Sequence, residues 1–153
     1  MTQLKSMRLL VVLYLLVSGF SWSQGRVADK EITSEWTLLD VRSGVEVYVQ
    51  RQDCALFANQ LPLEFLFFKV VNTNAQAMNV SYRIQSMYTE GCVGCDDIPE
   101  TMINMTVNGS SELVGTCEEM GQGLSVLLNN RNLKKGWTFQ SVQLNKFTVN
   151  PAK

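Results

Sequence analysis

Hydrophobic and polar residues alternate along several segments of the chain, which is the pattern of half-buried β-strands. The clearest alternation covers residues 78–85, and another covers residues 45–50. In residues 63–71 most side chains on both faces of the predicted strand are apolar, which indicates a central strand with both faces covered. No window of ten or more residues sustains the period of an amphipathic helix. The pattern therefore predicts a chain built almost entirely of strands.

The turn signals between these segments divide the chain into short strands. Asn108-Gly109 is the strongest hairpin signal, and it predicts that the strands on either side of it pair with each other. Turns recur roughly every 8–12 residues, a spacing typical of antiparallel sandwiches and barrels. The predicted strands are 36–41, 45–50, 63–71, 78–85, 103–107, 113–117, 124–128 and 137–149.

The strand pattern predicts an all-β fold with one domain. We expect a single antiparallel β-sandwich of about eight strands, immunoglobulin-like in the broad sense. A small closed β-barrel is the alternative, because alternation does not show whether a sheet closes. Residues 36–153 form the predicted sandwich, and residues 24–35 form a polar leader before it. This architecture hosts many functions, so the fold alone predicts no activity.

The first 23 residues have the three parts of a secretory signal. Lys5 and Arg8 precede an apolar run over residues 9–17, and Ser21-Trp22-Ser23 places small residues before a cut at Gln24. The run is about half the length of a membrane-spanning helix. We expect residues 1–23 to be cleaved, leaving no membrane span. The product is then exported, and is periplasmic, attached to the cell surface or secreted.

Four cysteines in a small exported domain indicate two disulfides. The favoured pairing is Cys54–Cys117 with Cys92–Cys95. In the alternative pairing, each outer cysteine bonds to one member of the central pair. If consecutive strands alternate in direction, all four cysteines lie at one end of the sandwich, within reach of each other.

The Cys92-Val93-Gly94-Cys95 motif allows two other interpretations. A redox-active dithiol is one, but the motif lies between predicted strands, and Asp96 and Asp97 would raise the thiol pKa. A zinc site of four cysteines is the other. It is less consistent with two lone cysteines and an oxidising compartment.

Acidic residues surround the same motif and form a possible recognition loop with a tyrosine that we expect to be exposed. Converging carboxylates can hold calcium, although the spacing fits no EF-hand loop and solvated acidic loops are common. The metal ligands, if any, are unknown. This predicted recognition surface covers residues 88–100 together with residues 118–122. Its candidate residues are Tyr88, Glu90, Asp96, Asp97, Glu100, Glu118 and Glu119.

Composition removes several classes of function. The chain has no histidine, which excludes Ser-His-Asp and Cys-His catalysis and histidine-bound metals. It has 13 basic and 14 acidic residues, and two of the basic ones belong to the export signal. A weakly acidic domain is a poor binder of nucleic acid. Three glycosylation sequons begin at Asn79, Asn104 and Asn108.

These observations predict an exported, disulfide-bonded, non-catalytic binding or structural module. Its expected partner is an extracytoplasmic protein or a glycan, and no cofactor is expected. A module that binds calcium or zinc is the alternative, followed by a thiol-redox protein that uses Cys92 and Cys95.

Overall fold

The computed structural model describes residues 25–55, 62–120, 122–128 and 136–153. Within these residues ten strands form two antiparallel sheets. The first sheet contains β1 (Arg26–Ala28), β10 (Phe139–Pro151), β5 (Met78–Tyr88), β6 (Gly91–Val93) and β7 (Ile103–Val107). The second sheet contains β2 (Thr37–Arg42), β3 (Val45–Cys54), β4 (Leu63–Asn72), β8 (Ser111–Val114) and β9 (Ser125–Leu127).

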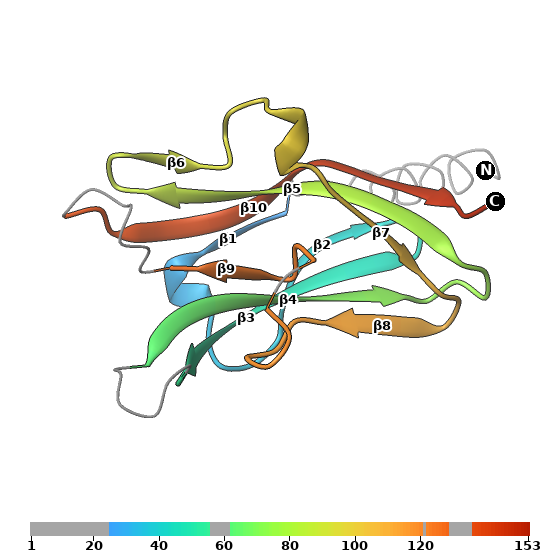
Figure 1. The fold of residues 1–153 in the computed structure, drawn as a ribbon, viewed down its shortest axis with the longest axis horizontal. Helices are drawn as coiled ribbons and strands as arrows, with labels where there is room; N and C mark the ends of the chain where they lie inside the picture. Colours follow the sequence, from blue (N-terminus) through green and yellow to red (C-terminus); the bar gives the residue numbers. More distant parts are fainter. Residues whose placement is uncertain (1–24, 56–61, 121, 129–135) are drawn as a thin grey trace, which may run out of the picture.

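The two sheets pack face to face as a β-sandwich (Figure 1). The described strands do not close into a barrel, because each sheet ends in edge strands. Helical structure in the described residues is limited to two 3-10 turns, η1 (Asp29–Glu31) and η2 (Pro99–Thr101). The predicted sandwich is therefore confirmed, and the barrel alternative is wrong.

The buried faces follow the alternation of the sequence. Val45, Val47 and Val49 of β3 are fully buried in the core between the sheets. In β4, Leu66, Phe68 and Val70 face this core, whereas the side chains between them face the other side of the sheet. Removal of these apolar side chains from water is the main force that holds the sheets together.

A second, smaller hydrophobic cluster covers the outer face of the second sheet. Phe65 and Phe67 stack there with ring centroids 5.7 Å apart. Buried Cys54 completes the cluster, and residues from the segment after β8 pack against it. The outer face of this sheet is therefore partly covered by the chain itself.

Two of the ten strands were not among the eight predicted. β1 lies in the segment expected to be a polar leader, and it pairs with β10 from Arg26 to Ala28. Only Val27 of β1 is buried, so three residues with one inward side chain gave too short a pattern to detect. β6 pairs with the end of β5. The sandwich thus begins before residue 36.

The turn at Asn108-Gly109 does not form a hairpin. β7 pairs with β5 in the first sheet, whereas β8 pairs with β4 in the second. The turn therefore carries the chain from one sheet to the other, and the predicted pairing is wrong. A turn signal fixes a local reversal of the chain, but the partner strand is chosen by packing.

None of the helices in the described part of the chain is long and apolar enough to cross a membrane. The predicted export signal, residues 1–23, lies outside the described residues.

Candidate functional site

Both disulfides form in the favoured pairing, Cys54–Cys117 and Cys92–Cys95. Cys54 belongs to the cluster on the outer face of the second sheet. Cys92 lies opposite Met87 on the outer face of the first sheet. The two bonds are thus separated by both sheets, and the prediction that all four cysteines come within reach of each other is wrong. It failed because the loops fold back over opposite outer faces.

The Cys92–Cys95 bond closes a short loop at β6. Neither cysteine precedes an α-helix, so the context that activates redox dithiols is missing. Gly94 has φ = 80° and packs so closely on the carbonyl of Ile84 that a Cβ would collide with it. None of the four cysteines is free, because both pairs form disulfides.

The segment between β6 and β7 covers part of the first sheet. Beneath it lies Arg83, which donates from Nη1 to Asp97 at 3.0 Å and from Nη2 to the carbonyl of Ile98 at 2.9 Å. Lys146 also donates to Asp97, at 2.5 Å. The hydrogen bonds from Lys146 and then Arg83 lower the pKa of Asp97 below its usual value. Asp97 therefore fastens this segment to the sheet.

Tyr88 is buried, contrary to the expectation that it is exposed. Its ring packs at 5.8 Å from Phe139 and 6.0 Å from Trp137, and its hydroxyl donates to the carbonyl of Leu128 at 3.4 Å. Burial raises the pKa of its hydroxyl. Tyr88 continues the alternate positions of β5 whose side chains face the core, and the sequence already showed this spacing. It therefore belongs to the core.

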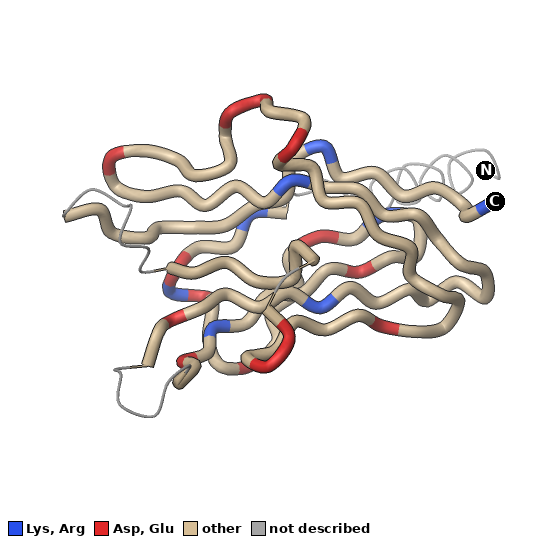
Figure 2. Tube along the Cα trace, in the orientation of Figure 1, with Lys and Arg blue, Asp and Glu red and all other residues tan. Residues whose placement is uncertain are grey.

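The other predicted recognition residues do not form one surface. Glu90, Asp96 and Glu100 are exposed around β6 and η2, whereas Glu118 and Glu119 are exposed on the loop after β8. Figure 2 shows acidic residues on these two loops at opposite sides of the molecule. Among the described residues no three acidic or cysteine side chains come together in a group able to hold a metal ion.

The loop after β8 interrupts what is otherwise one edge strand. β8 and β9 both pair with β4, and Phe68 of β4 bonds to both ends of the interruption. The amide of Gly115 donates to the carbonyl of Phe68 at 3.0 Å, and the amide of Phe68 donates to the carbonyl of Leu124 at 2.9 Å. This loop covers residues 116–123, of which residue 121 lies outside the described residues, and Cys117 near its start is bonded to Cys54 at the end of β3.

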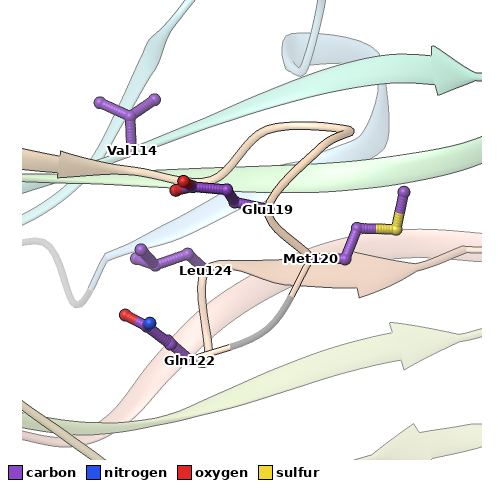
Figure 3. Close-up of a pocket in the computed structure, with 5 residues that line it drawn as sticks. All are labelled: Val114, Glu119, Met120, Gln122 and Leu124. Carbon is purple, nitrogen blue, oxygen red and sulfur yellow. The ribbon is translucent and has the colours of Figure 1, made fainter.

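A pocket of about 290 Å³ lies at the side of this loop. Its apolar part comes from Val114 and Leu124, and its polar part from Glu119 and Gln122 (Figure 3). Gln122 has a left-handed backbone with φ = 53°. Met120 also lines the pocket and packs against the outer cluster. The pocket therefore combines apolar walls with one carboxylate and one amide.

Sequence reasoning named the segment 118–122, which holds three of the lining residues, but missed Val114 and Leu124. Val114 and Leu124 were assigned to the predicted strands 113–117 and 124–128. The signal that was available is the glycine at each end of the loop. Gly115 has no room for a Cβ beside the carbonyl of Leu124, which brings the two ends together.

A second concave surface lies on the outer face of the first sheet. It has a volume of about 490 Å³ and crosses β5, β7 and β10. Its outward side chains are Asn79, Ser81, Asn104, Thr106, Thr148 and Asn150, named here the polar face. The sequence marked two of these asparagines only as glycosylation sequons.

Comparisons with known proteins place this chain in no family. No family model matches the sequence, and no curated protein is significantly similar to it. Among solved structures the chain is similar to the trimeric lipoprotein SadB of Salmonella enterica, with a TM-score of 0.35 and 10% identity. The match covers 99% of this chain and 75% of that chain. A likeness of this size carries no argument about function or assembly.

Proposed function

We propose that the protein is a non-catalytic binding module that acts outside the cytoplasm. We further propose that the pocket at the loop 116–123 receives a basic side chain of a partner protein. The pocket carries this proposal, because apolar walls and a carboxylate meet beside a loop that a disulfide holds in place.

The chemistry of the pocket matches the two parts of a lysine or arginine side chain. Such side chains have an apolar stem and a cationic head. Val114 and Leu124 offer surface for the stem, and Glu119 offers a counter-charge for the head. The amide oxygen of Gln122 is a further acceptor for the N–H groups. At about 290 Å³ the pocket has room for one lysine or arginine side chain.

The absence of histidine supports a non-catalytic role, since the chain lacks the commonest general base. The setting of Cys92 and Cys95 supports it too, since neither precedes an α-helix that would activate a thiolate. The two disulfides also support a location in an oxidising compartment.

The pocket is tested with Nα-acetyl-lysine N-methylamide and its arginine analogue in an NMR titration. The norleucine analogue, which keeps the stem and lacks the charge, serves as the reference ligand. We expect the basic probes to shift the amides of residues 114–124 and to bind more tightly than norleucine. Because Glu119 is exposed, the preference should be modest, about 3- to 5-fold.

Glu119→Gln should abolish that preference and keep the weak binding of norleucine. Glu118→Gln is the matched control, because Glu118 is the neighbouring exposed carboxylate and does not line the pocket. Equal binding of the basic and norleucine probes to the unmodified protein contradicts the proposal. An equal loss in the two glutamate variants also contradicts it, because the effect would then be one of net charge.

The extracytoplasmic location is tested by the intact mass of the product, measured before and after reduction and alkylation. We expect a chain that begins at Gln24 and gains four alkyl groups only after reduction. A full-length chain with four free thiols would contradict this location.

A further inference from the structure

The polar face consists of two aligned rows of uncharged side chains. In one row Thr148 and Asn104 lie on either side of Ser81, and in the other Asn150 and Thr106 lie on either side of Asn79. Neighbouring strands are about 4.8 Å apart, and alternate residues of a strand are about 6.7 Å apart. The register thus produces a regular array of amide and hydroxyl groups.

Hydrogen bonds fix the middle of this array. The hydroxyl of Ser81 donates to Oδ1 of Asn104 at 2.8 Å, and the hydroxyl of Thr106 donates to Oδ1 of Asn79 at 2.8 Å. Since side-chain freedom is already lost in these pairs, a ligand does not have to order them again. By contrast, Thr148 and Asn150 make no side-chain hydrogen bond with other described residues, so their polar groups are open to a ligand.

The polar face carries no charge. None of the residues that line it is Asp, Glu, Lys or Arg. The next outward residue of β5 is Arg83, which is occupied by Asp97 and the carbonyl of Ile98. A phosphate or an acidic sugar would therefore find no free cation here, and an apolar peptide would leave the amides and hydroxyls unpaired.

We propose that the polar face binds a neutral carbohydrate. Sugar hydroxyls both donate and accept hydrogen bonds, as the threonine and serine hydroxyls and the asparagine amides of this face also do. A neutral sugar pairs with them and requires no buried counter-charge. This site is on the opposite sheet from the pocket at residues 116–123, so the proposal stands independently of the proposed function.

The test uses unglycosylated full-length mature protein and three neutral probes: maltohexaose, cellohexaose and xylohexaose. An oligomannuronate of similar length is the anionic comparison. Amide shifts are followed by NMR up to millimolar concentrations. We expect saturable shifts confined to residues 78–82, 103–107 and 147–151 with at least one neutral probe, and weaker or no binding of the oligomannuronate.

Thr148→Val is the test variant, because it removes one hydroxyl and keeps the shape of the side chain. We expect it to weaken binding about 3- to 10-fold, as the loss of one hydrogen bond implies. Thr138→Val is the matched control, since Thr138 is an exposed threonine outside the polar face and should leave affinity unchanged. No saturable shift with any neutral probe overturns the proposal. Tighter binding of the oligomannuronate, or equal effects of the two valine variants, also overturns it.

Discussion

Arg83 is 2% exposed, whereas its ion-pair partner Asp97 is 71% exposed, with 3.0 Å between Nη1 and Oδ1. The pair therefore joins the sheet to a loop that would otherwise lie free in solvent. Lys146 reaches the same carboxylate from β10. Because a buried guanidinium without its counter-charge is costly, the position of the loop and the stability of the sheet are coupled.

Asp97→Asn should lower the free energy of unfolding at neutral pH, and the difference from the unmodified protein should vanish in acid. The pKa of Asp97 is lowered in the folded state, so its contribution is present above the usual carboxyl pKa near 4. It is lost as the pH falls through the lowered folded value. Urea unfolding at several pH values measures this. Asp96→Asn, an exposed neighbour, is the control and should show no such convergence.

Removing the Cys54–Cys117 bond by a double change to alanine should cost about 4 kcal/mol of unfolding free energy. The bond spans a sequence separation of 63, and longer closed loops lose more entropy in the unfolded chain. Removing the Cys92–Cys95 bond in the same way should cost much less unfolding free energy, because that bond closes a sequence separation of only 3. Denaturant unfolding followed by tryptophan fluorescence compares them. An equal cost for both would contradict the chain-entropy explanation.

Asn72→Ala should destabilise the fold by about 3 kcal/mol. The carbonyls of Gln76, Val107 and Asn108 lie 2.8–3.1 Å from its buried amide nitrogen, so the two N–H groups are shared among three acceptors at the end of β7 and in the turns between the two sheets. Losing the donor leaves acceptors unpaired. Thermal and urea unfolding give the measurement.

Two further variants separate the role of the Asn72 donor from side-chain volume. Asn72→Asp keeps the size but cannot donate, so it should be at least as unstable as Asn72→Ala. Asn150→Ala on the surface should change stability by less than about 0.5 kcal/mol. A stable aspartate variant would show that the three carbonyls do not depend on the amide.

Tyr82 should remain protonated until the protein unfolds in alkali. It is fully buried, and burial raises the pKa of its hydroxyl far above the usual value near 10. The stabilisation by the neutral phenol is present below pH 10 and is lost as the pH rises above it. Ultraviolet titration of tyrosinate measures this. In the Tyr82→Phe variant, the tyrosinate signal that rises together with unfolding should be smaller. In the Tyr48→Phe variant, the signal that rises before unfolding should be smaller.

Gln122→Gly should raise the free energy of unfolding by up to about 1 kcal/mol and weaken binding of the lysine probe. The left-handed backbone of Gln122 disfavours a side chain, and glycine relieves that cost. Gln122→Ala keeps the backbone cost and should lose affinity without gaining stability. If both variants bind as the unmodified protein does, the amide has no part in recognition.

The regular strands could be predicted because each has a single buried face. Val45, Val47 and Val49 are repeated at a spacing of two and all are buried. The apolar stretch at 63–71 was correctly interpreted as covered on both sides, although the outer cover is a disulfide-bonded loop and not a further sheet. The local sequence pattern therefore predicts which apolar side chains of this fold are buried.

The site was less predictable because it depends on which strands become neighbours. Asn108-Gly109 fixes a turn, but the buried amide of Asn72 is what connects it to the second sheet. Asp97 was expected on an open acidic loop, and it pairs with Arg83, 14 residues before it, and with Lys146, 49 residues after it. Such long-range contacts follow from the assembled sandwich, and a local pattern does not contain them.

The two ends of residues 116–123 are bonded to the same residue, Phe68, through Gly115 and Leu124. A replacement peptide between positions 115 and 124 would therefore enter and leave the molecule at one fixed point. Its length and composition could change while the sandwich keeps its register, because the edge strand resumes at the same place. The protein thus offers a ready scaffold for displaying foreign loops, provided that a cysteine in the insert still reaches Cys54.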